Sequence, residues 1–302
     1  MEQNSSPFGT LKFFDPISLS KKTESLVMKG NKRKYIRFGT TPDYKTGIAT
    51  GYAVGCNLRC VFCGANETRE DLDLVKDFYS PEEVFKILSR IIEKKPRIDK
   101  MRISDGESTI GFHHLLELIE LAEQSSLRMF VIETNGLILG HDENLIKELS
   151  KFKKIYVRVS LKAGTPEEFS RKTGAIPDAF ELPFEAVRKL REYGVDFGVS
   201  AMTADPRFMD PLERISLISR LGSIDPKLVL RLEEEMTILF PTAKKRLNSY
   251  GWETRHSKLP FFLRGPWGKY FQISYEPLNR LKKQKVSFHH TLKNILQLRH
   301  GI

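Results

Sequence analysis

The sequence contains few cysteines, and their number limits the chemistry that they can do. All three lie within eight residues, at Cys56, Cys60 and Cys63, with the spacing C-x3-C-x2-C, and the rest of the 302 residues contain none. An odd number of clustered cysteines argues against a disulfide framework and for reduced thiols in a cytoplasmic protein. Three thiolates alone also cannot complete a tetrahedral four-ligand site, and no further cysteine exists to supply the fourth ligand.

Long apolar runs are absent as well. No stretch of 18 apolar residues occurs, so we expect no segment that spans a membrane. The first residues, MEQNSSPFGTLKFF, do not combine a basic region with a following apolar one, and no secretory signal is expected there.

Acidic residues are scarce in the last fifth of the chain. Residues 241–302 contain thirteen Lys or Arg and two Asp or Glu, whereas residues 1–240 carry 36 of each sign. The net charge of +11 therefore belongs to this segment, which also holds both tryptophans and seven Phe or Tyr. We expect this basic aromatic C-terminal extension to cap the open side of a barrel. Alternatives are that it binds a polyanion by base stacking and phosphate contacts, or docks an acidic partner.

Between residues 46 and 240 the pattern alternates between strands and helices. Capping-box sequences at Ser80 and Thr165 predict two helix starts, and periodic apolar residues predict further helices. Strands are expected at 48–54, 100–104, 129–133, 154–161, 195–202 and 228–236. Six strands alternating with helices predict an α/β fold with parallel strands and right-handed crossovers, an incomplete (β/α)6 barrel of the TIM type.

Two extensions flank this core. Residues 1–45 are expected to form an N-terminal extension that is loose at first and then contains short elements. The basic stretch Lys29 to Lys34 within it is expected to be solvated. Residues 241–302 are expected to form the C-terminal extension, with a helix near 289–299.

Polar motifs follow the carboxyl ends of the predicted strands. Ser104 to Thr109 follows the second strand, Thr134-Asn135 follows the third, and Ser160 and Lys162 follow at the end of the fourth. Because loops after parallel strands meet at one end of such a sheet, we expect these residues to lie with the cysteine loop. One carboxylate of the run Glu233 to Glu235 is a further candidate for the barrel mouth.

The cysteine spacing, with the aromatic Phe62 before the last cysteine, resembles the hallmark of the radical SAM superfamily. The resemblance implies that Cys56, Cys60 and Cys63 hold three irons of a [4Fe–4S] cluster. The fourth iron then chelates the amino and carboxylate groups of S-adenosylmethionine, whose reductive cleavage gives a 5′-deoxyadenosyl radical. The segment from Ser104 through Gly106 and Glu107 to Ser108 is similar to the family's G-G-E-P segment, which helps hold the methionine ammonium. Asp105 replaces the first glycine of that segment, and Ser108 replaces the proline.

Two later segments resemble glycyl-radical-enzyme activating enzymes, and the core also resembles uncharacterised archaeal-type radical SAM proteins. Glu133 to Gly136 is similar to D-T-N-G, and Ser160 to Lys162 with Thr173-Gly174 is similar to D-x-K…T-G. By this resemblance Lys162 meets the methionine carboxylate, and Thr134 and Asn135 line the same pocket. Phe62, Ser104 and Ser160 belong to the expected cofactor-binding set as well. Because Ser160 stands where the activating enzymes have Asp, a bound monovalent cation is not expected.

The resemblance implies an enzyme that takes a hydrogen atom from its substrate and receives electrons from a low-potential donor such as flavodoxin or ferredoxin. An activase-like protein or peptide substrate is favoured, and modification of RNA such as tRNA is the alternative. A non-catalytic iron–sulfur module is a third hypothesis. Less favoured are a zinc site completed by His113 or His114 and an electron-transfer ferredoxin, which needs a fourth cysteine.

Overall fold

A computed structural model describes residues 13–65, 67–205, 207–237 and 240–252, together with the strands 260–264 and 270–274. Its main sheet has the strand order β1-β2-β3-β5-β6-β7-β8-β9. Neighbouring strands are parallel from β3 to β9. These are β3 (Ile48–Ala53), β5 (Lys100–Asp105), β6 (Met129–Thr134), β7 (Ile155–Leu161), β8 (Phe197–Ala201) and β9 (Glu233–Glu234). The predicted α/β class and the six-stranded partial barrel are confirmed.

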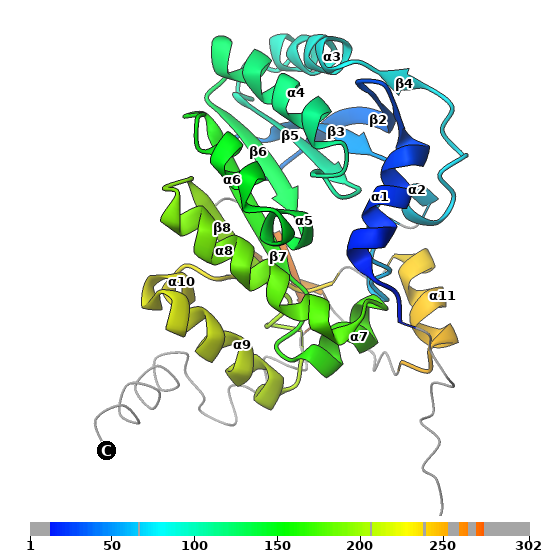
Figure 1. The fold of residues 1–302 in the computed structure, drawn as a ribbon, viewed down its shortest axis with the longest axis vertical. Coiled ribbons are helices and arrows are strands. Elements are labelled where there is room, and N and C mark those ends of the chain that lie inside the picture. The colour runs from blue at the N-terminus through cyan, green and yellow to red at the C-terminus, as the bar shows by residue number, and fades with distance from the viewer. Residues whose placement is uncertain are drawn as a thin grey trace, which may run out of the picture.

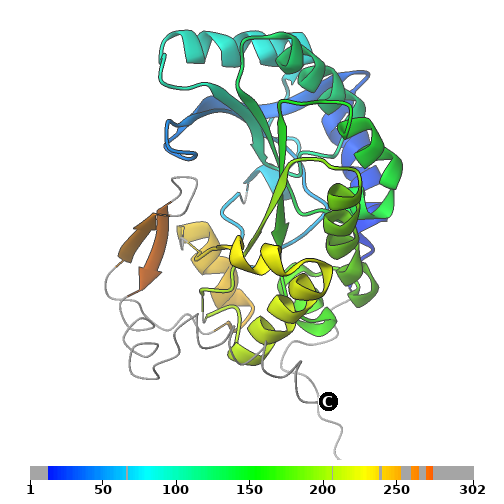
Figure 2. The same cartoon turned by 90° about the vertical axis from the view of Figure 1, so that its left-hand side faces the viewer.

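Helices cover the outer face of the curved sheet (Figures 1 and 2). They are α3 (Pro81–Glu93), α4 (Phe112–Gln124), α5 (Leu137–His141), α6 (Glu143–Leu149), α7 (Pro166–Thr173), α8 (Leu182–Glu192) and α9 (Pro211–Ile224), with a 3₁₀ turn at Pro177–Glu181. The Ser80 hydroxyl accepts from the Glu83 amide and the Glu83 carboxylate accepts from the Ser80 amide, which is the capping box that the sequence predicts. Thr165 caps α7 through the amide of Glu168.

The N-terminal part of the chain extends the sheet on one edge. The helix α1 (Pro16–Val27) leads into β1 (Met28–Lys29) and the ten-residue strand β2 (Lys32–Thr41), which pairs antiparallel with β3 and with β4 (Phe78–Tyr79). The prediction of short elements here is wrong for β2. The prediction of a solvated basic stretch is wrong for Arg33 and Lys34, which are buried. Their guanidinium and ammonium groups donate to backbone carbonyls, which satisfies them away from water.

The strand predicted at 228–236 is present only at its two residues Glu233 and Glu234, and residues 228–230 belong to a helix instead. Asp225 accepts from the amide of Lys227 and Pro226 occupies the first helical position, so α10 (Pro226–Leu230) forms before the two-residue strand β9. A capped helix start with proline in its first turn outweighs the apolar residues that suggested a strand.

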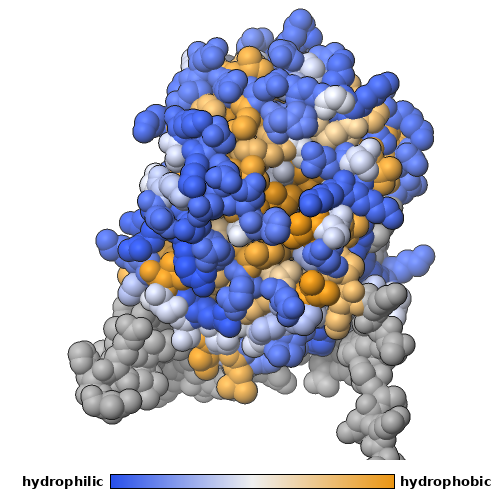
Figure 3. Space-filling model, in the orientation of Figure 1, coloured by the Kyte–Doolittle hydropathy of each residue, from blue (hydrophilic) through white to orange (hydrophobic). Residues whose placement is uncertain are grey.

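The surface on the side shown in Figure 3 is mainly hydrophilic, with apolar residues gathered in its middle, between α1 and the helices α4 and α5. No helix of the described residues is both long and apolar enough to cross a membrane. The described part of the C-terminal extension comprises α11 (Pro241–Ser249), the residues to Trp252, and the antiparallel pair β10 (Pro260–Arg264) and β11 (Tyr270–Ser274). The helix predicted near 289–299 lies outside the described residues.

His114 joins α4 to the N-terminal strands and gives a testable pH dependence. Its Nδ1 lies 2.8 Å from the Asn31 carbonyl oxygen and its Nε2 lies 2.9 Å from the Tyr35 hydroxyl. A carbonyl only accepts, so Nδ1 carries the proton and the hydroxyl donates to Nε2. Burial lowers the pKa of His114 to about 4, well below its unfolded value of about 6.5.

The contribution of neutral His114 to stability should therefore be complete above pH 6.5 and fall as the pH drops toward 4. Between pH 7 and pH 5 we expect the free energy of unfolding to fall by about 2 kcal/mol more in the wild type than in His114→Gln. Urea denaturation at both pH values measures the difference. His113→Gln, at the exposed neighbouring position, is the control and should keep the pH dependence of the wild type. Equal pH dependence of the unfolding free energy in the wild type and His114→Gln would refute the assignment.

Candidate active site

The cysteine loop follows β3 and is held through its backbone. The amide of Arg59 donates to the carbonyl of Thr173 (2.9 Å), and the amide of Val61 donates to the carbonyl of Lys172 (2.9 Å), so the last turn of α7 carries the loop. The Lys172 ammonium is buried against both carboxylate oxygens of Glu213 at 2.6 Å, which fixes this end of α7 to α9. The cysteines therefore project from a rigid segment.

Gly106 brings the end of β5 against the same loop. Its amide donates to Ala53 (3.0 Å), and a Cβ atom at this position would lie 2.4 Å from the carbonyl oxygen of Gly55. No side chain fits there, because the obstructing atom belongs to the backbone. Asp105, just before it, has φ +76, a left-handed conformation that L-residues rarely adopt.

Glu107 joins three segments through its buried carboxylate. Oε1 accepts from the hydroxyls of Thr134 (2.6 Å) and Thr109 (2.7 Å) and from the Thr109 amide (3.1 Å), and Oε2 accepts from the amide of Asn135 (2.8 Å). The Asn135 side chain in turn donates to the Asn57 carboxamide oxygen at 2.7 Å, which reaches the cysteine loop. The sequence predicted a role for Glu107 in binding but gave no indication that it also organises the loops.

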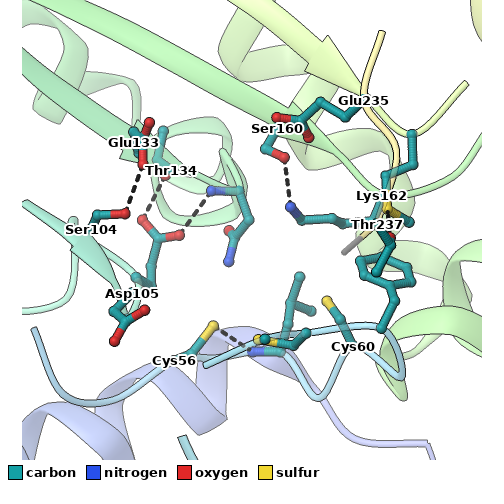
Figure 4. Close-up of a pocket in the computed structure, with 18 of the residues that line it drawn as sticks. Cys56, Cys60, Ser104, Asp105, Glu133, Thr134, Ser160, Lys162, Glu235 and Thr237 are labelled. Atoms are coloured by element: carbon teal, nitrogen blue, oxygen red, sulfur yellow. Dashed lines mark hydrogen bonds between the residues drawn. The ribbon is translucent and has the colours of Figure 1, made fainter. Parts of the chain in front are cut away.

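Every residue predicted to belong to the site lines one cavity of about 430 Å³. A volume in the range of roughly 300–1,000 Å³ is usual for a small-molecule site. The lining includes Cys56, Cys60, Cys63, Phe62, Ser104, Gly106, Glu107, Thr134, Asn135, Ser160 and Lys162. In Figure 4, Cys56 and Cys60 face Ser160 and Glu235 across this space, and Lys162 reaches in from the side. The individual ligand roles of these residues stay predictions.

The thiols of Cys56 and Cys60 lie in surroundings that raise the pKa of each and favour the neutral form. Burial, followed by the negative charge of Glu107, raises the pKa of Cys56 to about 12. Burial raises the pKa of Cys60 also, although the Lys162 ammonium acts in the opposite direction. A thiolate here needs a compensating cation, and iron bound to the sulfur supplies one.

Lys162, which the resemblance predicts to meet the methionine carboxylate, lines the cavity. Its Nζ donates to the Ser160 hydroxyl at 2.6 Å. The short serine leaves the ammonium directed into the cavity (Figure 4).

A layer of buried ion pairs forms the wall opposite the cysteines, and sequence reasoning largely missed it. Arg102 pairs with Glu133 (2.9 Å) and Asp43 (2.8 Å). Arg158 pairs with Glu233 (2.6 Å) and with Glu235, and Glu235 is the member of its acidic run that lines the cavity. Ser104 donates to Glu133 at 2.7 Å, which connects this layer to the predicted site.

A sequence signal for this layer exists in β7. Arg158, Ser160 and Lys162 alternate with Val157, Val159 and Leu161, so one face of the strand is polar along its length. Alternation with a period of two in a strand whose other face is apolar indicates that the polar face lines the barrel interior.

The histidines considered as zinc ligands lie elsewhere. His114 is engaged by Asn31 and Tyr35, and the His113 Nε2 lies 3.2 Å from the carbonyl oxygen of Gly30. Neither lines the cavity.

Together, the fold and the cavity define an α/β-barrel enzyme with its site at the carboxyl ends of the parallel strands, opposite a loop of three thiols. The family model of the radical SAM superfamily matches residues 52–215. The chain belongs to the radical SAM superfamily. It is therefore an enzyme that uses a [4Fe–4S] cluster and S-adenosylmethionine.

Individual relatives agree with this membership. The chain is 29% identical over 197 residues to 7-carboxy-7-deazaguanine synthase of Hyperthermus butylicus, covering 61% of this chain and 80% of the relative. It is 30% identical over 142 residues to molybdenum cofactor biosynthesis protein 1 of Bos taurus, covering 46% of this chain and 21% of the relative. Spore photoproduct lyase with bound AdoMet and dinucleoside spore photoproduct has a similar fold, with a TM-score of 0.55 at 15% identity over 94% of this chain and 77% of that one.

Proposed function

We propose that this enzyme cleaves S-adenosylmethionine reductively and takes a hydrogen atom from a protein or peptide substrate. Cys56, Cys60 and Cys63 are the proposed cluster ligands. The observation that carries the proposal is that three thiols, an ammonium and a hydrogen-bonded carboxylate line one cavity. Bound cluster and S-adenosylmethionine supply the 5′-deoxyadenosyl radical, and the chain's residues supply binding and orientation.

Two charged side chains suit the two ends of a methionine group. The Lys162 ammonium complements the carboxylate, and the Glu107 Oε2, which accepts one protein hydrogen bond, complements the ammonium. Charge-assisted hydrogen bonds of this kind contribute roughly 1.5–3 kcal/mol each. The Glu107 segment is fixed by the hydrogen bond from its amide to the Gly55 carbonyl, and Lys162 directly follows β7, so both groups come from defined positions at the mouth of the barrel.

A protein or peptide substrate is supported by the segments similar to activating enzymes, whose residues Thr134, Asn135, Ser160 and Lys162 border the same cavity. The ion-pair layer opposite the cysteines holds four carboxylates against the two guanidinium groups of Arg102 and Arg158, and this excess of negative charge disfavours phosphate groups. RNA modification is the second candidate, because α11 presents the exposed Lys244 and Lys245 near the cysteine loop and the extension around it is basic. A low-potential flavodoxin or ferredoxin as electron donor and a cytoplasmic setting complete the proposal, since reduced thiols persist there.

Deuterium transfer distinguishes the substrate classes. The reconstituted, anaerobically reduced enzyme is incubated with S-adenosylmethionine and deuterated cell protein, tRNA or small-molecule fractions. Deuterium is then measured in 5′-deoxyadenosine. Transfer from the protein fraction is the expected result. Transfer from tRNA, with binding that weakens steeply as salt increases, would replace the peptide proposal with the RNA one. Transfer from small molecules alone would overturn both.

A further inference from the structure

A residue far from the cysteine motif in sequence contacts the cysteine loop directly. Arg246 lies on α11, outside the segment that the family model matches. Its Nη1 lies 3.0 Å from the carbonyl oxygen of Cys63 and 3.3 Å from those of Cys60 and Val61. One guanidinium thus donates to the peptide groups of two of the three cysteines.

Two further guanidinium groups hold the same loop from other sides. Arg69 is buried and donates from Nη1 to the carbonyl of Cys60 at 2.8 Å. Arg59 donates to the carbonyls of Cys56 (2.8 Å) and Leu58 (3.0 Å). Three guanidinium groups, those of Arg59, Arg69 and Arg246, thus donate to the backbone carbonyls of the cysteine loop.

The helix that carries Arg246 is fixed at both ends. At its start, Phe240 packs on the loop, since a Cβ added to Gly64 would meet its ring at 3.0 Å. Beyond its end, the Trp252 indole donates to the carbonyl of Arg207 at 2.8 Å and its ring lies 5.8 Å from that of Phe208. Phe208 in turn packs on Phe62 of the cysteine motif, with ring centroids 5.3 Å apart. Arg246 is therefore held in place by packing and not only by its hydrogen bonds.

A fixed positive charge at this position affects the reduction of a cluster bound by the neighbouring thiolates. Reduction adds one negative charge, which a nearby cation stabilises, and the effect is larger in surroundings of low dielectric. Hydrogen bonds and net charge around the ligand sulfurs are among the main determinants of iron–sulfur potentials.

We propose that Arg246 is a positioning residue that raises the reduction potential of the cluster by placing its charge against the cysteine loop. The C-terminal segment thereby takes part in the electron-accepting step of this enzyme. This inference rests on the proposed ligation by the three cysteines.

The test is a potentiometric titration of the reconstituted full-length enzyme, with the reduced cluster followed by electron paramagnetic resonance. In Arg246→Gln we expect the ratio of reduced to oxidised cluster at a fixed potential to fall about tenfold, equivalent to about 59 mV for a one-electron couple. Arg246→Lys keeps the charge and should recover most of this shift. Lys245→Gln removes the same charge from an exposed position on α11 and should leave the potential unchanged.

A wild-type potential in Arg246→Gln with full iron content would overturn the inference, as would loss of the cluster in the charge-conserving Arg246→Lys. Arg246→His adds a test within one protein, because the introduced histidine gains a positive charge as the pH falls from 8 to 6. The reduction potential of the cluster in this variant should rise over that range, and the potential of the wild-type cluster should change less. A failure of the proposed ligation by the three cysteines would give a different result, because the wild-type enzyme would then bind no cluster at all.

Discussion

Replacement of Cys60 by serine is expected to give a folded protein that binds less iron and forms no 5′-deoxyadenosine above background. Cys60 is buried, and serine has nearly the same size, so the change leaves the surrounding core almost intact. A serine hydroxyl is a poorer ligand for iron than a thiolate, which is the usual protein ligand of these clusters. Iron analysis, the visible absorbance of the cluster and chromatography of 5′-deoxyadenosine measure the three effects.

The control for Cys60→Ser is the thermal stability of the metal-free proteins, which should differ little between the variant and the wild type. Cys56→Ser and Cys63→Ser should show the same loss of product. Formation of 5′-deoxyadenosine at the wild-type rate in any of the three variants would contradict the assignment of that cysteine.

Replacement of Glu107 by glutamine is expected to weaken S-adenosylmethionine binding at least tenfold and to destabilise the fold at the same time. The carboxylate accepts hydrogen bonds from Thr109, Thr134 and Asn135, and each of its oxygens faces a backbone amide that can only donate, Oε1 that of Thr109 and Oε2 that of Asn135. An amide NH₂ can be placed only against another donor, which costs about 1.5–3 kcal/mol of the free energy of unfolding. The loss of negative charge removes the complement to the methionine ammonium, which accounts for the weaker binding.

Equilibrium dialysis with labelled S-adenosylmethionine and urea denaturation measure the two consequences of Glu107→Gln separately. Glu120→Gln on the exposed side of α4 is the matched control and should change neither quantity. Unaltered affinity together with reduced stability would show that Glu107 organises the loops without binding the cofactor.

The barrel and the residues that line the cavity could be predicted from the sequence because both follow from local rules. The capping box at Ser80 and the N-cap threonine Thr165 mark helix starts. Polar residues that follow parallel strands must converge at one end of the sheet, whatever the details of packing. The gathering of Cys56, Glu107 and Lys162 was therefore predictable without a structure.

Other features depend on contacts between distant segments, which no local pattern reveals. Arg33 is buried because the carbonyls of Glu107, Ser108 and Ile110 happen to face it across the sheet edge. Arg246 meets the cysteine loop only because Phe240 and Trp252 place α11 there. The ion-pair layer around Arg102 and Arg158 had a local signal in the polar alternation of β7, and the helix α10 had one in Asp225-Pro226. Both features were therefore predictable from the local sequence.

The measurement that tests the central claim most directly is the amount of 5′-deoxyadenosine formed by the reconstituted wild-type enzyme under anaerobic conditions. Reduced enzyme with S-adenosylmethionine should release 5′-deoxyadenosine and methionine, and omission of the reductant or of the cluster should abolish both. Intact S-adenosylmethionine after incubation with fully loaded, reduced enzyme and the proposed substrate classes would contradict the account.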